Sequence, residues 1–245
     1  MQKMFFEIHK DLPREGPGDS ESTRKAFSML TDIPESPRIL DIGCGPGMQT
    51  MDLIKLTTGT IVAVDNHQPY LDALTEKMVE EGLFHRIQVI HSDMFTLEFQ
   101  KDFFDVIWAE GSIYIIGFEK GINAWKPFLK EGGYLAVTEV SWLKPNAPEE
   151  LKTFWENAYP AIQDIEGNLE KIRTAGYGIV DSFTLPESAW WDNYYTPLEQ
   201  RLKIFREKHG GDDAAIELYE SELAEIKLYR TYSDYYGYVF YIMQV

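Results

Sequence analysis

The sequence predicts an α/β protein whose mostly parallel sheet is covered by helices on both faces. From residue 38 onwards, short apolar runs alternate with helical stretches, the order in which helices join parallel strands. Several of these runs are almost entirely apolar, which is typical of strands buried on both faces. At 245 residues, the chain is long enough for one domain with an insertion.

Seven segments have the pattern of strands. They are residues 38–42, 60–64, 87–91, 104–109, 134–140, 179–185 and 235–243. The first six are short, mainly apolar runs, and the last alternates apolar with polar side chains. The first strand runs directly into a glycine-rich turn, which predicts a ligand site at its carboxyl end.

The segments between the strands predict helices at residues 20–30, 48–56, 70–81, 119–130, 148–175, 197–208 and 213–228. Helix 70–81 carries Leu71 and Leu74 on one side and stops at Gly82, whereas Gly132 and Gly133 end helix 119–130 and Pro160 breaks helix 148–175. We expect an N-terminal extension (1–37) and a main domain (38–245), with a helical and aromatic insertion at about 186–231. Residues 14–18, rich in Pro and Gly, are either a lid over a ligand or an ordinary loop.

Composition limits the partners and the location. Nucleic-acid binders display clustered Lys and Arg, whereas the net charge here is −17, which would repel a polyanion or an anionic membrane surface. Solubility alone also explains this charge. The single cysteine, Cys44, forms no internal disulfide, and the sequence has neither a signal-peptide pattern nor a membrane-spanning run. We expect a cytoplasmic protein without nucleic-acid or membrane partners.

The most informative segment is the turn after the first strand, which reads Gly43-Cys44-Gly45-Pro46-Gly47. Such a turn lets the backbone approach a ligand closely, and the following helix presents unpaired N–H groups. Dinucleotide sites use G-x-G-x-x-G, but Met48 stands where their third glycine would fall. Asp41, two residues before Gly43, would repel a pyrophosphate and attract an ammonium group. The turn therefore favours an amino-acid moiety.

Acidic residues follow the next three predicted strands. Asp65 closes the second strand, where a carboxylate can accept hydrogen bonds from both ribose hydroxyls; alternatively it caps the next helix. After the third strand come Ser92, Asp93 and Met94, where the acid can reach an adenine amino group and the methionine can lie on the ring. Glu110 follows the fourth strand.

These motifs, in this order, resemble those of the class I S-adenosylmethionine-dependent methyltransferases over roughly residues 38–142. The resemblance implies a Rossmann-like, mostly parallel seven-stranded sheet with helices on both faces, an antiparallel last strand and a helical insertion before it. It also implies S-adenosylmethionine as cofactor, S-adenosylhomocysteine as product and a small-molecule acceptor. Carried over position by position, it assigns the methionine part to Asp41, Gly43, Gly45 and Gly47, the ribose and base to Asp65, Asn66, Ser92, Asp93 and Met94, and the region near the methyl group to Glu110.

The acceptor site carries weaker signals. We expect Glu110 and Tyr114 to serve catalysis by holding or deprotonating the acceptor. The aromatic residues around Trp191 and Tyr195 either wall the acceptor site or form the core of a subdomain. No histidine has metal-ligand spacing, so no metal is expected.

Two rival functions remain open. One is a nicotinamide-dependent oxidoreductase, which the missing third glycine disfavours. The other is a non-catalytic regulatory protein that binds S-adenosylmethionine, because the acceptor site has no diagnostic motif.

Overall fold

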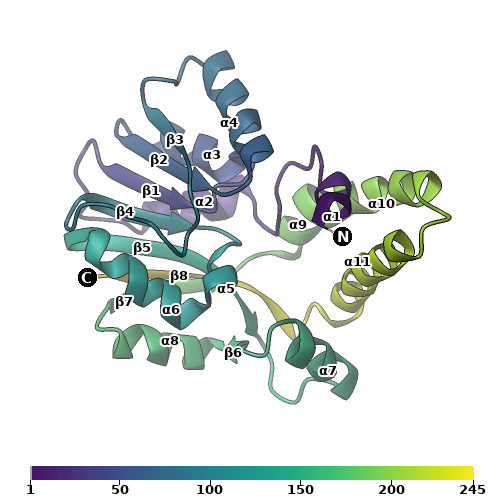
Figure 1. The fold of residues 1–245 in the computed structure, drawn as a ribbon. Helices are drawn as coiled ribbons and strands as arrows, with labels where there is room; N and C mark the ends of the chain where they lie inside the picture. The colour runs from purple at the N-terminus through teal and green to yellow at the C-terminus, as the bar shows by residue number, and fades with distance from the viewer. Residues whose placement is uncertain (1) are drawn as a thin grey trace.

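The structure is a computed structural model that describes residues 2–245, and it is built around one twisted sheet (Figure 1). The main path of the sheet runs in the order β3-β2-β1-β4-β5-β8-β7. The strands on it are β1 (Arg38–Ile42), β2 (Thr60–Asp65), β3 (Ile87–His91), β4 (Phe104–Ala109), β5 (Leu129–Trp142), β7 (Gly178–Thr184) and β8 (Tyr236–Gln244). The two-residue β6 (Gln163–Asp164) pairs with β5 off this path.

The first five strands are parallel to one another, and β8 lies antiparallel between β5 and β7. The predicted mostly parallel seven-stranded sheet with an antiparallel last strand is therefore confirmed, and β6 is an addition. The strand order reverses between β1 and β4. In open α/β sheets, ligands bind at such a reversal, outside the carboxyl ends of the strands.

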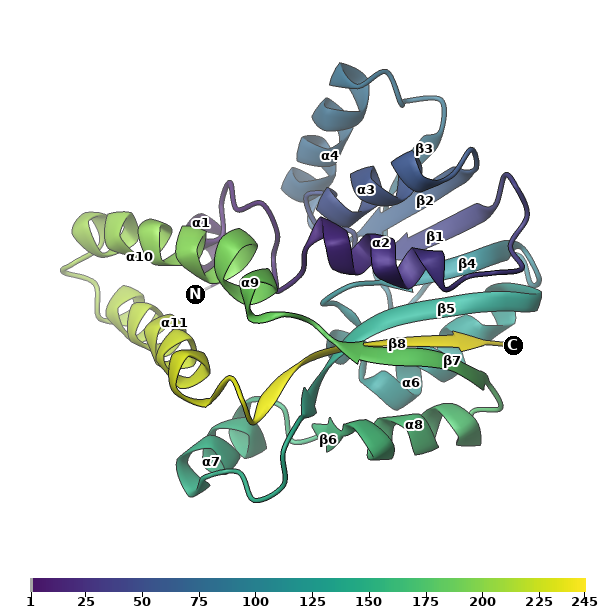
Figure 2. The same cartoon turned by 180° about the vertical axis from the view of Figure 1, so that it is seen from behind.

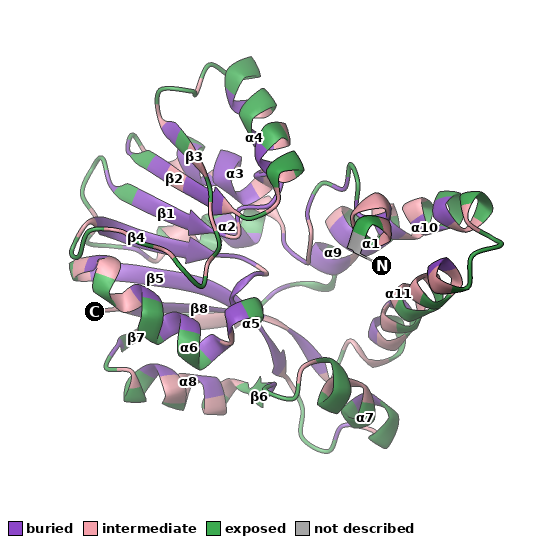
Figure 3. Ribbon diagram, in the orientation of Figure 1, coloured by how far each residue is buried: buried purple, intermediate pink, exposed green. Residues whose placement is uncertain are grey.

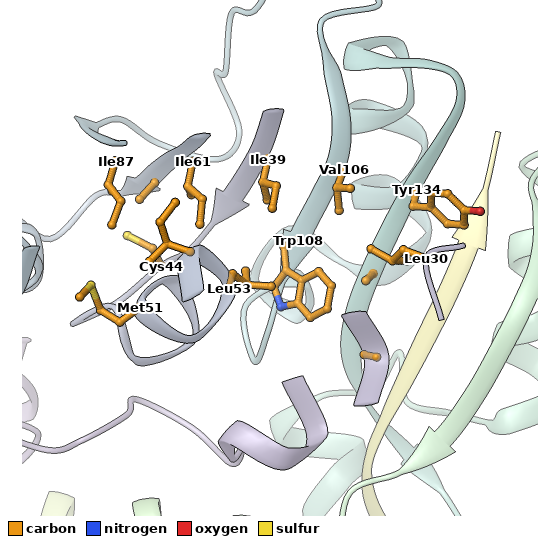
Figure 4. Close-up of a cluster of buried hydrophobic side chains, with 14 of the residues drawn as sticks. Leu30, Ile39, Cys44, Met51, Leu53, Ile61, Ile87, Val106, Trp108 and Tyr134 are labelled. Atoms are coloured by element: carbon orange, nitrogen blue, oxygen red, sulfur yellow. The ribbon is translucent and has the colours of Figure 1, made fainter. Parts of the chain in front are cut away.

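Helices cover both faces of the sheet (Figures 1 and 2). On one face lie α2 (Ser20–Ser28), α3 (Met48–Leu56) and α4 (Gln68–Glu80). On the other lie α6 (Phe118–Trp125) and α8 (Ile165–Thr174), while α5 (Ile113–Ile116) follows β4. Figure 4 shows the first of the two cores, where Leu53 of α3 and Trp108 of β4 pack between the layers. Strands β1, β4, β5 and β8 are buried along most of their length, whereas the edge strands β3 and β7 are mostly intermediate or exposed, and the outer sides of the helices are exposed (Figure 3).

The remaining helices lie beyond the carboxyl ends of the parallel strands (Figure 1). Four of them, with the π-helical turn Trp191–Tyr195, enclose a third core that we call the helical lobe: α1 (Gln2–Ile8), α9 (Glu187–Trp190), α10 (Thr196–Lys208) and α11 (Asp213–Tyr232). The short α7 (Glu149–Ala158) packs against the base of this lobe through Leu151. The sequence did not predict α1. None of the helices among residues 2–245 combines the length and apolarity that a membrane span requires.

The expectation of one helix over 119–130 is wrong. Helix α6 ends at Trp125, a 3₁₀ turn spans Lys126–Phe128, and β5 begins at Leu129. Pro127 has no N–H to continue an α-helix. Gly133 marks a strand irregularity instead of a helix end, because a Cβ there would lie 2.9 Å from the carbonyl oxygen of Lys130 and the β4–β5 register shifts beside it. The expected break at Pro160 is confirmed, with β6 placed between α7 and α8.

Candidate functional site

A cavity of about 1110 Å³, counted with its mouth, opens at the carboxyl ends of β1, β2 and β4. Most of the residues that the sequence assigned to a ligand site lie together in its wall: Gly43, Gly45, Asp65, Asn66, Ser92, Asp93, Met94, Glu110 and Tyr114. Asp41 and Gly47 do not line it. The cavity therefore coincides with the reversal of strand order, where the fold favours ligand binding.

The glycine turn serves two different purposes. Gly45, at φ +53°, lines the cavity, and a Cβ there would find only Glu15 Cγ within 4 Å, at 3.7 Å. Gly47, at φ +86°, faces α4 instead, where a Cβ would lie 2.4 Å from Leu74 Cδ1. Gly45 thus leaves the backbone open to a ligand, and Gly47 lets α3 and α4 pack closely.

Asp41 lies behind this turn and is fully buried. Its Oδ2 accepts a hydrogen bond of 2.6 Å from Thr50 Oγ1, whereas its Oδ1 has no partner. Burial raises the pKa of Asp41 to about 7, and the nearby charge of Glu110 acts in the same direction. An unpaired buried carboxylate oxygen is costly, so a positive charge on this side of the turn would stabilise the ionised form of Asp41.

Asp65 fixes the loop that faces the ligand. Its Oδ2 accepts from the backbone N–H of Gly45 at 2.9 Å, and its Oδ1 accepts from that of His67 at 2.9 Å. The N-cap of α4 is His67, and no side chain caps this helix, so Asp65 is not its cap. Each carboxylate oxygen keeps a free lone pair that can accept from a ribose hydroxyl.

The residues after β3 are held in place by backbone contacts. Ser92 N–H donates to the carbonyl oxygen of Asp65 at 3.0 Å, and Asp93 Oδ1 accepts from Phe95 N–H at 2.9 Å. Met94 and Asn66 line the same part of the cavity. These residues therefore form one wall of the cavity next to Asp65.

Glu110 accepts three side-chain hydrogen bonds, and its side chain is fully buried. Its Oε2 accepts from Arg14 Nη2 at 2.6 Å, and its Oε1 accepts from Thr23 Oγ1 at 2.7 Å and from Trp108 Nε1 at 2.8 Å. A carboxylate with three such donors is suited to hold a neighbour in position. Arg14, 4% exposed, still has an Nη1 without a hydrogen-bond partner.

The N-terminal segment forms much of the cavity wall, which sequence reasoning missed apart from the possible lid at residues 14–18. Arg14, Glu15 and Gly16 line the cavity, together with Phe5 and Phe6 of α1. The ring of Phe6 stacks on that of His67, with centroids 3.6 Å apart and planes 8° from parallel. The Pro/Gly composition was the only sequence signal for this wall.

Tyr114 of α5 also lines the cavity and is 43% exposed. The expected aromatic partners from the insertion do not join it there. Trp191 and Tyr195 lie outside the cavity wall and belong to the helical lobe, where the rings of Tyr195 and Trp190 pack at a tilt of 40° with centroids 5.7 Å apart. Of the two alternatives, the subdomain core is the one the structure shows. Residues 2–245 contain no group of three His, Cys, Asp or Glu side chains arranged to hold a metal ion.

The strand order and the glycine turn define the fold of the class I S-adenosylmethionine-dependent methyltransferases. Residues 39–133 match the family model described as "Methyltransferase domain". This segment of the chain therefore resembles a methyltransferase domain, and the resemblance inferred from the motifs is confirmed.

Relatives in sequence match mainly this segment. A sterol 24-C-methyltransferase of Aspergillus fumigatus is 28% identical over 116 residues, which cover 47% of this chain and 30% of that protein. The methyltransferase GfsG of Streptomyces halstedii is 27% identical over 119 residues, covering 48% of this chain and 42% of that protein. The matched segment thus spans less than half the length of these curated relatives.

Solved structures match along the whole chain. A methyltransferase from Geobacter sulfurreducens in complex with S-adenosylhomocysteine superposes with a TM-score of 0.84 at 19% identity, over 99% of this chain and 98% of the other. YjhP from E. coli gives a TM-score of 0.85 at 20% identity, over 98% of both chains. The shared fold therefore includes the helical lobe.

Proposed function

We propose that this chain transfers the methyl group of S-adenosylmethionine to a small-molecule acceptor. The observation that carries the proposal is a cavity at the strand reversal whose wall offers a separate group for each part of this cofactor. The proposal rests on the fit between those groups and the cofactor.

The methionine part is a zwitterion, and two unpaired buried atoms match its charges. Arg14 Nη1, in the cavity wall, can donate to the α-carboxylate. The partnerless Oδ1 of Asp41 supports the α-ammonium from behind the turn. Gly45 leaves room for the backbone to approach the same moiety. We therefore assign this end of the cavity to the amino-acid part.

The nucleoside part would lie along the second and third strands. The free lone pairs of Asp65 suit the two ribose hydroxyls, and Asp93 and Met94 suit the edge and the face of the base. Asn66 and Ser92 complete this wall. A pyrophosphate would meet the carboxylates of Asp65 and Glu110 instead, which argues against the rival oxidoreductase.

The bound cofactor would supply a methyl group on a positively charged sulfur. An acceptor held in line with the S–C bond forms a bond to the methyl carbon, and the electrons of the broken bond remain on sulfur, so correct positioning contributes much of the rate. Glu110 would act by fixing Arg14, and Tyr114, at the mouth of the cavity, would contact the acceptor. We expect a cytoplasmic enzyme, as the acidic composition and the single cysteine suggest.

Two measurements test this proposal. Calorimetric titrations with S-adenosylmethionine, S-adenosylhomocysteine and NAD should show binding of the first two alone. Incubation with methyl-labelled cofactor and a metabolite extract should then transfer label to small molecules, which separates an enzyme from a regulatory binding protein. Binding of NAD with no response to the other ligands would refute the assignment.

A further inference from the structure

Half of the large apolar side chains that are exposed in residues 2–245 gather at one place, the mouth of the cavity. The four that line the cavity, each between 37% and 51% exposed, are Phe5, Phe95, Tyr114 and Ile115. We call these four residues the apolar rim. The other exposed large apolar side chains do not line the cavity and are those of Val79, Phe84, Val180 and Ile204. Exposed apolar side chains gathered in one patch commonly mark a binding surface.

The apolar rim is assembled from three parts of the chain. Tyr114 and Ile115 belong to α5, which follows β4, and Phe5 belongs to α1. Phe95 lies in the loop after β3, where Lys120 of α6 places its Nζ 4.9 Å from the centre of the Phe95 ring. Because α6 directly follows α5, this contact brings Phe95 next to the segment that carries Tyr114 and Ile115.

Neighbouring rings hold two members of the apolar rim in place. The ring of Phe5 stacks on that of His9, with centroids 4.1 Å apart. The ring of Tyr114 meets that of Tyr159 edge-on, with centroids 6.2 Å apart. A side chain that is already ordered loses little conformational freedom when a ligand covers it. The rim is therefore a surface prepared for binding.

The charged groups on the N-terminal side of the cavity wall are already paired. Among the lining residues, Arg14 is the one Lys or Arg, and Glu110 neutralises it. Glu15 Oε2 lies 3.0 Å from Nδ1 of the buried His9. Although burial alone would lower it, Glu15 and Glu222 raise the pKa of His9 to about 9, so a protonated imidazole balances the charge of Glu15.

The other carboxylates of the wall lie on the nucleoside side, where Asp65 and Asp93 are assigned to the ribose and the base. Near the end of β4, Ser112 Oγ already donates to the carbonyl oxygen of Ile42 at 2.7 Å. Beyond the cofactor, the residues that line the mouth therefore offer apolar surface and the hydroxyl of Tyr114, with no charge left unpaired.

We infer that the methyl acceptor is an uncharged molecule whose apolar body, a hydrocarbon chain or ring, covers the apolar rim. Ligand sites are lined mainly by apolar and aromatic side chains, and a charged acceptor would lose hydration here without gaining a partner. This substrate class rests on the proposed methyl transfer and narrows it. Transfer to an oxygen, nitrogen or sulfur atom of the acceptor would use a lone pair of that atom, leave the electrons of the S–C bond on sulfur and release the atom's proton to water.

A homologous series tests the apolar body. The fluorescence of the uncharged probe N-phenyl-1-naphthylamine should rise on binding to protein loaded with S-adenosylhomocysteine, and 1-butanol, 1-hexanol and 1-octanol should displace the probe. Because each buried CH₂ group contributes about a fourfold gain in affinity, affinity should rise roughly tenfold for every two carbons. Octylamine and octanoate should bind at least ten times more weakly than 1-octanol. Equal affinities along the series, or tighter binding of either charged compound, would overturn the inference.

Matched variants locate the bound probe. Ile115→Ser and Phe95→Ser should each weaken its binding about tenfold and leave the affinity for S-adenosylhomocysteine nearly unchanged. The controls Ile204→Ser and Phe84→Ser remove the same side chains at exposed positions outside the cavity and should change neither affinity. If the rim variants weaken S-adenosylhomocysteine binding as much as probe binding, the rim covers the cofactor and the inference is wrong.

Turnover and assembly provide two further readouts. After incubation with methyl-labelled S-adenosylmethionine and a metabolite extract, the label should enter products that partition into octanol, and label confined to the water phase would contradict the inference. Sedimentation and flotation with phosphatidylcholine vesicles compare the parent with Ile115→Ser. Self-association or vesicle binding that is lost in this variant, with probe affinity unchanged, would assign the rim to another occupant. Failure of the parent to bind S-adenosylhomocysteine would instead refute the proposed function.

Discussion

Arg14 and Glu110, 96 residues apart in the chain, form a buried ion pair in which Nη2 lies 2.6 Å from Oε2. The pair joins the N-terminal segment to the end of β4. Thr23 and Trp108 donate to the other oxygen of Glu110. Removing one charge from such a pair leaves the other buried and unpaired, which costs more than the pair contributes as a whole.

Glu110→Gln should therefore destabilise the protein by roughly 3–5 kcal/mol. The amide retains an oxygen for Thr23 and Trp108, but it leaves the guanidinium of Arg14 without its counter-charge. Urea unfolding measures the change. Glu81→Gln is the matched control, because Glu81 is 44% exposed in its pair with Lys55 and exposed pairs contribute about 0–1 kcal/mol. Equal effects of the two variants would mean that the buried pair contributes no more than a surface one.

Arg14→Gln should weaken binding of S-adenosylhomocysteine about tenfold or more, because a charge-assisted hydrogen bond contributes roughly 1.5–3 kcal/mol. Binding of 5′-methylthioadenosine, which lacks the amino-acid part, should be much less affected. Calorimetry with both ligands separates a lost carboxylate contact from a general disturbance of the cavity. Equal losses for the two ligands would contradict the assigned role of Nη1.

Asp65→Ala should reduce affinity for S-adenosylhomocysteine and for adenosine by similar factors, about tenfold or more. The variant removes the proposed ribose acceptor and also releases the N–H groups of Gly45 and His67. Asp65→Asn keeps an oxygen for one of these groups and should fall between Ala and the parent. Circular dichroism checks that each variant is folded. An unchanged affinity for adenosine would place the ribose elsewhere.

His9 should make stability fall as the pH rises above neutrality. Its folded pKa of about 9 lies above the ordinary value of 6.5, so its contribution is complete below about pH 6.5 and is lost as the pH rises through 9. The stability difference between the parent and His9→Gln should shrink over this range in urea unfolding. His85→Gln, at an exposed position, should show no such trend. A difference that stays constant with pH would rule out a protonated His9.

Local patterns were sufficient to predict the sheet and to bring most of the predicted ligand-site residues into one cavity wall. Gly45, Asp65 and Asp93 lie at or within three residues of the carboxyl ends of β1, β2 and β3, so strand order brings them together in the cavity wall. The prediction of a helix over 119–130 was wrong because Pro127 ends the helix and the irregular pairing of β4 with β5 sets the following backbone. That pairing depends on β4, a strand some 25 residues earlier in the chain, which gives no local sequence signal.

Long-range contacts explain what the sequence left open. The partner of Arg14 lies 96 residues away, so its position in the wall has no local signal. Tyr195 was a candidate for the acceptor site, but it packs against Tyr229 of α11 with ring centroids 5.6 Å apart. Aromatic composition is the same for a pocket and for a core, and only the position of α11 distinguishes them.

The position of Arg14 depends on the absence of a side chain at Gly18. A Cβ at Gly18 would lie 2.5 Å from both Cζ and Nη2 of Arg14, whereas a Cβ at Gly16 would meet no atom within 4 Å. Gly18→Ala should therefore displace the guanidinium, weaken S-adenosylhomocysteine binding about as much as Arg14→Gln does, and speed hydrogen exchange in residues 14–18. Gly16→Ala, in the same segment, should leave affinity and exchange close to those of the parent.

In the parent, ligand should slow this exchange, as expected for a segment that covers a bound cofactor. Equal affinities of the two alanine variants would show that the close contact of Gly18 with Arg14 has no part in binding.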